Sequence, residues 1–190
     1  VITGSARGRR LRELEGQETR PTTGRVKEGL FSALQFDIEG RRVLDLFAGT
    51  GQLGIECLSR GAASAVFVDQ RQDAVRLVRE NLAATGLSDR AQVICGNALD
   101  VLARTRETFD LIFLDPPYGT GLLEAVLEQC ARTGFDILNP HGIIAAEHPA
   151  DRPPAAPDGP CRFYRTYRYG KIGVTIFRRE ETQRNEGISP

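Results

Sequence analysis

The sequence contains no tryptophan and no methionine, only two histidines, and four cysteines that are scattered singly. No Cys-x-x-Cys pair and no Cys/His spacing typical of a metal site occurs, so we expect neither a metal nor a disulfide framework, as in a reduced cytoplasmic protein. The longest apolar runs have about seven residues, against roughly 18 for a membrane span, so we expect no membrane segment. The arginine-rich start lacks an apolar stretch, so we also expect no signal peptide.

Charge of one sign is not in excess, because the 190 residues carry 25 basic and 25 acidic side chains. The net charge therefore says little about partners. The basic side chains gather at the two ends of the chain: residues 1–27 hold seven against three acids, and residues 161–179 hold six and no acid. The length predicts one domain with a core of useful size.

Short apolar runs alternate with helical patterns through the middle of the chain. This alternation predicts a parallel sheet with helices on both faces. After Glu147, a proline-rich connection leads to two alternating segments around Gly170, which predicts an antiparallel hairpin over 162–179. The expected strands are 41–47, 63–69, 91–95, 109–115 and 142–148, and the expected helices are 52–61, 71–86, 98–105 and 121–132.

The start of the chain is predicted to form a small extension of that sheet. Residues 22–36 have apolar side chains at helical spacing, and residues 1–14 are expected to form a short strand or hairpin. We expect an extension over 1–38 and a main domain over 39–190, which together are effectively one domain. The fold class is α/β with a seven-stranded, mostly parallel sheet.

The segment GTGQLG at residues 49–54 has the G-x-G-x-x-G spacing of a dinucleotide-binding turn. Asp69, 20 residues after Gly49, lies where a ribose-binding carboxylate is expected. Asp45, just before the turn, would repel an anionic pyrophosphate but attract the ammonium and sulfonium groups of S-adenosylmethionine. We therefore favour S-adenosylmethionine over NAD. A tight strand-to-helix turn without a ligand is the plainer alternative.

A second motif, Asp115-Pro116-Pro117-Tyr118, ends the fourth expected strand, at the sheet edge where α/β proteins bind ligands. The two prolines have no N–H to donate, so the Asp115 carboxylate and the Pro116 carbonyl are left as acceptors. Tyr118 adds a flat aromatic face. Acceptors for an amino group beside a stacking ring predict a pocket for a flipped nucleobase. A Pro-Pro turn with a packing tyrosine is the alternative.

Together, DLFAGTG and DPPY resemble the class I S-adenosylmethionine-dependent methyltransferases that act on amino groups of nucleic acids, which have a Rossmann-like fold. Flanking segments resemble the bacterial RsmD type, which methylates the N2 amino group of the guanine at position 966 of 16S ribosomal RNA. These segments are GSARGRRL at the start, TRPTTGRVKEGLF at 19–31, SRGAASAVFVD at 59–69 and YGKIGVTIF at 169–177. The resemblance covers almost the whole chain and implies a 16S ribosomal RNA substrate, within the small ribosomal subunit or an assembly intermediate.

The resemblance also implies roles for individual residues. The catalytic set is Asp115, Pro116, Pro117 and Tyr118, which would hold the guanine. Asp45, Gly49 and Gly51 would hold the methionine end of the cofactor, Asp69 the ribose, and Asn97 with Ala98 the adenine. The family usually has Asp in place of Asn97, which puts the tightness of cofactor binding in question. The remaining implied cofactor contacts are Arg20, Thr22, Arg25, Phe47, Ala48 and Gln70, with Asp115 shared between the cofactor and the base.

The basic N-terminal stretch with Arg7, Arg9 and Arg10 is the expected RNA contact, together with Tyr118. The tail RFYRTYRYG is equally compatible with RNA binding and with a charged hairpin at the sheet edge that makes no RNA contact. Three alternatives stay open: an adenine-N6 methyltransferase, a non-enzymatic RNA-binding module, and an NAD-dependent oxidoreductase. The first usually needs a recognition domain for which this chain has no room, the intact DPPY argues against the second, and Asp45 argues against the third.

Overall fold

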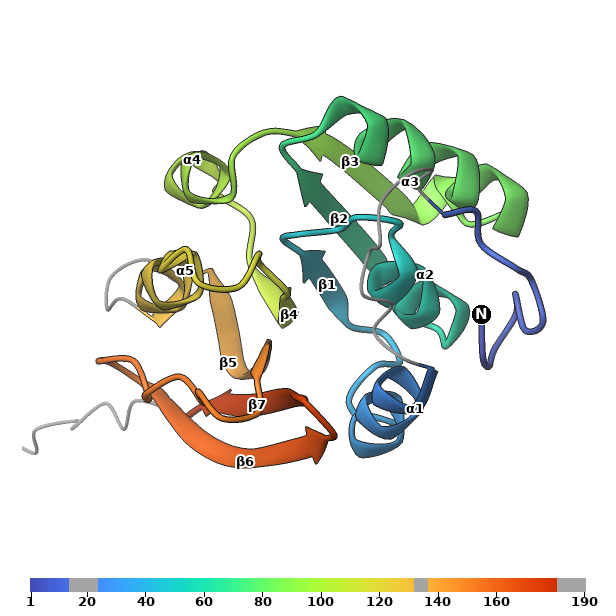
Figure 1. The fold of residues 1–190 in the computed structure, drawn as a ribbon. Helices are drawn as coiled ribbons and strands as arrows, with labels where there is room; N and C mark the ends of the chain where they lie inside the picture. Colours follow the sequence, from blue (N-terminus) through green and yellow to red (C-terminus); the bar gives the residue numbers. More distant parts are fainter. Residues whose placement is uncertain (14–23, 132–136, 181–190) are drawn as a thin grey trace, which may run out of the picture.

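The computed structural model describes residues 1–13, 24–131 and 137–180. Helices and strands alternate along it, as the apolar pattern predicts (Figure 1). The elements are α1 (Gly24–Ala33), β1 (Arg42–Asp45), α2 (Gln52–Ser59), β2 (Ser64–Asp69), α3 (Gln72–Thr85), the 3-10 helix η1 (Ser88–Arg90), β3 (Ala91–Cys95), α4 (Ala98–Arg104), β4 (Phe109–Leu114), α5 (Leu122–Ala131), β5 (Leu138–Pro149), β6 (Cys161–Tyr169) and β7 (Ile172–Arg179).

The strands form one seven-stranded sheet in the order β3-β2-β1-β4-β5-β7-β6. The first five strands along this order run parallel, and β7 and β6 are antiparallel to their neighbours. The predicted Rossmann-like fold with a C-terminal hairpin is therefore confirmed. β5 begins before the expected 142, because Leu138 already pairs with Phe109 ahead of a register shift.

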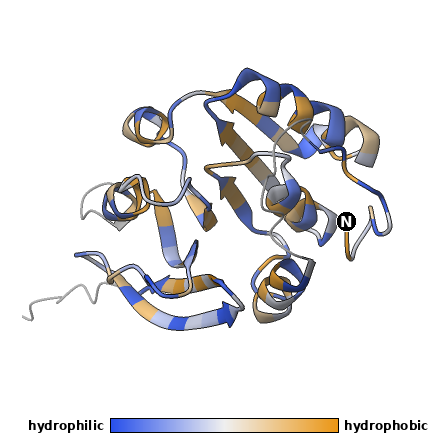
Figure 2. Cartoon of the chain, viewed as in Figure 1, coloured by the Kyte–Doolittle hydropathy of each residue, from blue (hydrophilic) through white to orange (hydrophobic). Residues whose placement is uncertain are grey.

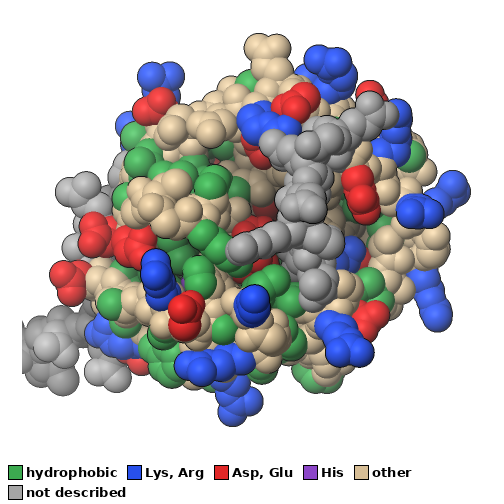
Figure 3. Space-filling view, viewed as in Figure 1, with side chains coloured by type: hydrophobic (Ala, Val, Ile, Leu, Met, Phe, Trp, Pro, Cys, Tyr) green, Lys and Arg blue, Asp and Glu red, His purple; other side chains and the backbone are tan. Residues whose placement is uncertain are grey.

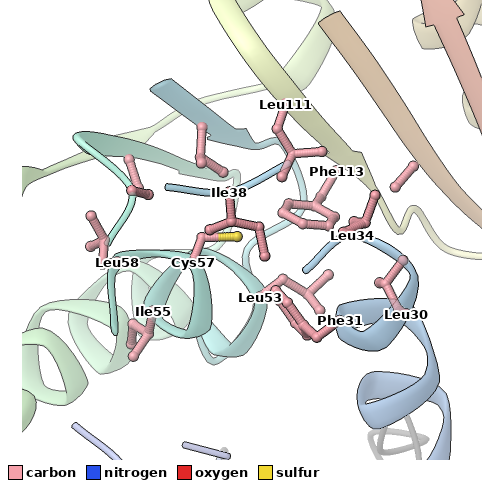
Figure 4. Packing of buried hydrophobic residues seen from close by; sticks show 14 of the residues in the cluster. Leu30, Phe31, Leu34, Ile38, Leu53, Ile55, Cys57, Leu58, Leu111 and Phe113 are labelled. Carbon is pink, nitrogen blue, oxygen red and sulfur yellow. The ribbon is translucent and has the colours of Figure 1, made fainter. Parts of the chain in front are cut away.

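Helices lie on both faces of the sheet (Figures 1 and 2), and alternate residues of the strands pack against one layer or the other. Val43, Phe67 and Phe113 pack with α1, α2 and α3, and Figure 4 shows this cluster from close by, with Phe31 of α1 near Phe113. Leu44 and Ile112, their neighbours in the strands, pack with α4 and α5 on the other face. Because strands between helical layers are buried on both sides, nearly continuous apolar runs were their signature in the sequence.

The direction of the connections changes between β1 and β4. The chain passes from β1 to β2 and from β2 to β3 through α2 and α3 on one face, and it returns to β4 and β5 through α4 and α5 on the other. β1 and β4 are nevertheless neighbours, with Val43 opposite Leu111. Such a switch point leaves a crevice at the carboxyl ends of the two strands, where open α/β sheets bind ligands.

The C-terminal hairpin is joined to the sheet by buried polar side chains. His148 Nε2 lies 2.8 Å from Thr175 Oγ1, which lies 2.8 Å from Thr166 Oγ1. This chain of hydrogen bonds crosses β5, β7 and β6. His148 is buried, and burial lowers its pKa, so the structure gives this histidine a structural role at the junction.

The strand or hairpin expected over 1–14 is wrong for the described residues 1–13, which form turns. Side chains of α2 accept hydrogen bonds from backbone N–H groups of this segment that would otherwise bind a neighbouring strand. Glu56 Oε2 accepts a hydrogen bond from the Ile2 N–H at 2.7 Å, and Glu56 Oε1 accepts one from the Thr3 N–H at 3.0 Å. Ser59 Oγ accepts one from the Ala6 N–H at 2.9 Å. The segment is thus bound to the domain by polar contacts and by packing of Val1, Ala6 and Leu11 on the core, without strand pairing.

Candidate functional site

A cavity of about 660 Å³ opens at the carboxyl ends of β1, β2 and β4, at the switch point of the sheet. Figure 3 shows a hollow on this face of the molecule, with atoms of acidic side chains visible inside it. Both sequence motifs contribute to the wall. The predicted site residues that line the cavity are Phe47, Ala48, Gly49, Asp69, Gln70, Asn97, Ala98, Asp115, Pro116, Pro117 and Tyr118.

The glycine turn between β1 and α2 is held by a carboxylate from the next strand. Gly49 has φ +54° and Gly51 has φ +78°, values that side chains disfavour. The Gly49 N–H donates to Asp69 Oδ2 at 2.9 Å, and the Arg71 N–H donates to Asp69 Oδ1 at 2.9 Å. A Cβ on Gly49 would meet nothing within 4 Å, whereas one on Gly51 would lie 3.2 Å from Ile55 Cδ1. The missing side chain at Gly49 therefore leaves space open beside the turn. The missing side chain at Gly51 leaves room for Ile55 of α2 to pack against the turn.

Asp45 lies behind the turn rather than in the cavity wall. It is 2% exposed, and its Oδ2 accepts a hydrogen bond from the Gly54 N–H at 3.1 Å. Burial raises the pKa of Asp45 to about 7, against the lowering effect of that hydrogen bond and with a further contribution from the Asp69 charge. Because Asp45 does not line the cavity, it would act on a bound ligand through its electrostatic field. A cation bound nearby would favour the ionised form of this carboxyl group.

Asn97 and Ala98, at the start of α4, also line the cavity. Asn97 is the N-cap residue, and its Oδ1 accepts from the Leu99 N–H at 2.9 Å and from the Asp100 N–H at 3.4 Å. The helix therefore uses the amide oxygen, and the amide nitrogen is the group with which Asn97 can meet a ligand. An aspartate would cap the same helix and offer an acceptor instead.

The Asp-Pro-Pro-Tyr motif follows β4. Burial, the Glu147 charge, the Asp45 charge and hydrogen bonding to Glu147 raise the pKa of Asp115 well above its usual range. The Tyr118 hydroxyl donates to Glu147 Oε1 at 3.0 Å. All four residues of the motif line one cavity, together with a second acidic residue, Glu147 of β5.

Other predicted site residues lie elsewhere. Arg25 is exposed in the first turn of α1 and does not line the cavity. The exposed Arg7, Arg9 and Arg10 lie in the N-terminal segment, also away from the cavity wall. Arg20 and Thr22 lie outside the described residues.

The sequence of this chain matches one known protein family. The family described as "Conserved hypothetical protein 95" matches residues 1–178. The chain belongs to this family. Together with the relatives named in the next paragraph, this match confirms the resemblance predicted from the sequence motifs.

Relatives of this chain are similar to it over most of their length. The Bacillus subtilis (strain 168) protein "Putative rRNA methyltransferase YlbH" is 42% identical over 184 residues, which cover 94% of this chain and 98% of that protein. "Ribosomal RNA small subunit methyltransferase D" of Escherichia coli (strain K12) is 33% identical over 182 residues, covering 95% and 89%. The solved structure "Putative methyltransferase yhhF from Escherichia coli" has a TM-score of 0.84 at 32% identity, covering 96% and 98%.

Two residues of this family member were not predicted from the sequence. Glu147 lines the cavity from β5, and its signal was an acidic residue directly after the apolar run 143–146. Asn81 of α3 is buried and joins the N-terminal segment to the glycine turn: its Oδ1 accepts from the Arg12 N–H at 2.8 Å, and its Nδ2 donates to the Thr50 carbonyl at 2.9 Å. This link places Glu13, the next residue, in the cavity wall.

Two kinds of feature are absent from the described part of the chain. No helix there has the length and apolarity to cross a bilayer. No group of three or more His, Cys, Asp or Glu side chains among residues 1–13, 24–131 and 137–180 could hold a metal ion.

Proposed function

We propose that this protein transfers a methyl group from S-adenosylmethionine to the 2-amino group of a guanine in 16S ribosomal RNA. The observation that carries the proposal is that the glycine turn after β1 and the Asp-Pro-Pro-Tyr motif after β4 line one cavity. A relative with 33% identity bears the name ribosomal RNA small subunit methyltransferase D. The guanine at position 966 is the target that the family resemblance implies.

The acidic surroundings of the turn fit S-adenosylmethionine, which carries an ammonium and a sulfonium. Asp45 would provide negative potential from behind Gly49 and Gly51, and Asp69, which lines the cavity, would accept hydrogen bonds from the ribose hydroxyls. A Cβ at Gly49 would project into open space, so a ligand can approach the backbone there.

The rest of the cofactor half of the cavity fits the adenosine. Phe47, Ala48 and Gln70 continue the wall, and Asn97 with Ala98 would meet the adenine. Because Asn97 Oδ1 accepts the hydrogen bonds that cap α4, the amide nitrogen of Asn97 would donate to a ring nitrogen of the adenine. Arg20, Thr22 and Arg25 stay proposed contacts from the N-terminal side.

The residues after β4 would hold the flipped guanine. Bound S-adenosylmethionine supplies the electrophilic methyl group. The Asp115 carboxylate and the Pro116 carbonyl accept hydrogen bonds from the amino group, and Tyr118 stacks on the ring. The amino nitrogen gains positive charge as it attacks, so the Asp115 carboxylate stabilises the transition state more than the ground state. Pro117 keeps the backbone of this loop rigid.

Arg7, Arg9 and Arg10 would bind the phosphates of the RNA. All three are exposed, and Glu56 and Ser59 hold the segment that carries them on the body of the protein. Figure 3 shows blue Lys and Arg side chains around the outline of this face, with acidic atoms in the hollow. We place the protein in the cytoplasm, with the small ribosomal subunit or an assembly intermediate as its partner.

One assay tests the function against its rivals. The protein is incubated with methyl-labelled S-adenosylmethionine and, in parallel, with 30S subunits lacking the modification, naked 16S RNA and DNA. The expected result is one labelled N2-methylguanine in 16S RNA and no labelled DNA. Labelled N6-methyladenine would instead support the adenine-N6 alternative. Calorimetry that detects NAD binding and no binding of S-adenosylmethionine would support an oxidoreductase.

A further inference from the structure

Two acidic side chains lie next to one another at the carboxyl edge of the sheet. Leu114 of β4 pairs with Ala146 of β5, and Asp115 and Glu147 are the next residues on these parallel strands. Both line the cavity. This register places the two carboxyl groups close together, and the Glu147 charge accordingly adds to the burial that raises the pKa of Asp115.

Tyr118 sets the position of Glu147. Its hydroxyl donates to Glu147 Oε1 at 3.0 Å, so the loop after β4 and the strand β5 are joined across the cavity wall. The opposite side of Glu147 is backed by β7, where Val174 is its partner in the antiparallel ladder. The carboxyl group of Glu147 is therefore fixed beside Asp115 by a strand and by a side-chain hydrogen bond.

Two adjacent acceptors match one nucleobase edge. Guanine presents its N1–H and its 2-amino group side by side, so both neighbouring positions are donors. Adenine and cytosine present an amino group beside a ring nitrogen with a lone pair, which a second carboxylate would repel. A base held through its amino group by Asp115 therefore meets Glu147 with its ring nitrogen.

We infer that Glu147 is the residue that selects guanine, by accepting the N1–H of the flipped base while Asp115 and the Pro116 carbonyl accept from its 2-amino group. This inference rests on the proposed guanine-N2 function. The two donors of guanine would stabilise the ionised form of both carboxyl groups, against the burial and mutual repulsion that raise the pKa of Asp115. Tyr118 has a second task besides stacking, which is to hold the Glu147 carboxylate toward the base.

The variant Glu147→Gln tests this, because it keeps the size of the side chain and an oxygen for the Tyr118 hydroxyl but replaces an acceptor with an NH2 donor. The substrates are small subunits reconstituted with 16S RNA that carries either guanine or 2-aminopurine at the nucleotide methylated by the wild type. 2-Aminopurine retains the 2-amino group, but its N1 has a lone pair in place of the hydrogen. The measurement is kcat/KM for labelled methyl transfer to each substrate.

Opposite changes are expected for the two substrates. The wild type should prefer guanine by about 100-fold, since 2-aminopurine places a lone pair against a carboxylate. Glu147→Gln should lower the rate on guanine by about 10- to 100-fold and raise the rate on 2-aminopurine by about tenfold, because the amide NH2 can donate to N1. Glu147→Ala, which offers neither group, should lose activity on guanine without gaining any on 2-aminopurine. Glu128→Gln, the same change at an exposed position of α5, should keep the wild-type preference.

Several results would overturn the inference. An equal loss on both substrates in Glu147→Gln would make Glu147 a structural residue, and an unchanged preference for guanine would exclude it from base selection. In both cases the wild type still methylates guanine, so the proposed function stands. A wild type that methylates no guanine would refute the function and the inference together. S-adenosylhomocysteine affinity and the unfolding temperature, measured on each variant, show that the protein is folded.

Discussion

Replacing Asp115 by asparagine separates the charge of this side chain from its shape. Asparagine keeps the size and one acceptor oxygen, but it cannot offer a negative charge to the amino nitrogen as that atom becomes positive. A hydrogen bond to a charged group contributes about 1.5–3 kcal/mol. Since 1.36 kcal/mol corresponds to a factor of ten, the methyl-transfer rate should fall about 10- to 200-fold. Because Glu147 and the Pro116 carbonyl remain in the cavity as acceptors, a total loss of activity is not expected.

The assay is a single-turnover measurement with enzyme in excess over 30S subunits and with methyl-labelled S-adenosylmethionine. It reports the transfer step without contributions from product release. Cofactor affinity, measured by calorimetry, should change little, because the base and not the adenosine lies against Asp115 in the proposed arrangement. Tyr118→Phe is a matched comparison, because it keeps the aromatic ring and removes only the hydroxyl bonded to Glu147.

An unchanged single-turnover rate in Asp115→Asn would refute the reasoning, since it would show that the carboxylate charge does not drive transfer. A large loss of cofactor affinity with a normal rate at saturation would also refute it, because Asp115 would then belong to the cofactor site.

Three more outcomes are expected. Because the pKa of Asp45 is raised to about 7, a fall from about pH 8 to about pH 6 should protonate it and weaken calorimetric binding of the cationic cofactor about tenfold, and Asp45→Asn should remove this dependence. Replacing Arg7, Arg9 and Arg10 by alanine should weaken RNA binding and lower the slope of log affinity against log salt by roughly 0.9 per lost phosphate contact, while an unchanged slope would mean a merely solvated face. Glu56→Gln should lower the free energy of unfolding in urea by about 3–5 kcal/mol, since it leaves Lys27 and Arg60 without the charge of the buried Glu56; a loss below about 1 kcal/mol would contradict this.

The strands and helices of the main domain could be predicted because their apolar patterns are local. The glycine turn and the Asp-Pro-Pro-Tyr motif could be placed at the same edge of the sheet because each follows a predicted parallel strand. The division at residues 38 and 39 stays a prediction, as do the roles of the individual site residues. What the local pattern could not supply is the partner of each polar side chain.

Glu147 illustrates that limit. It lay inside a predicted strand, and only the pairing of Leu114 with Ala146 brings it beside Asp115. The N-terminal segment illustrates the same point, because its backbone donors are taken by Glu56 and Ser59, more than fifty residues away, and no strand forms. Both outcomes depend on long-range contacts between polar groups, which leave no periodic signal in the sequence.

The switch point also determines how the site depends on the completion of folding. Val43 pairs with Ala65 on one side and with Leu111 on the other, and the second pairing closes a loop about three times as long, at an entropic cost about 1 kcal/mol greater. The cavity lies across this most distant pairing. A chain in which only β1, β2 and β3 have paired would possess the glycine turn but no opposite wall. The pairing of β1 with β4 therefore joins the two motif-bearing halves of the site, and whatever separates these two strands parts the glycine turn from the Asp-Pro-Pro-Tyr motif.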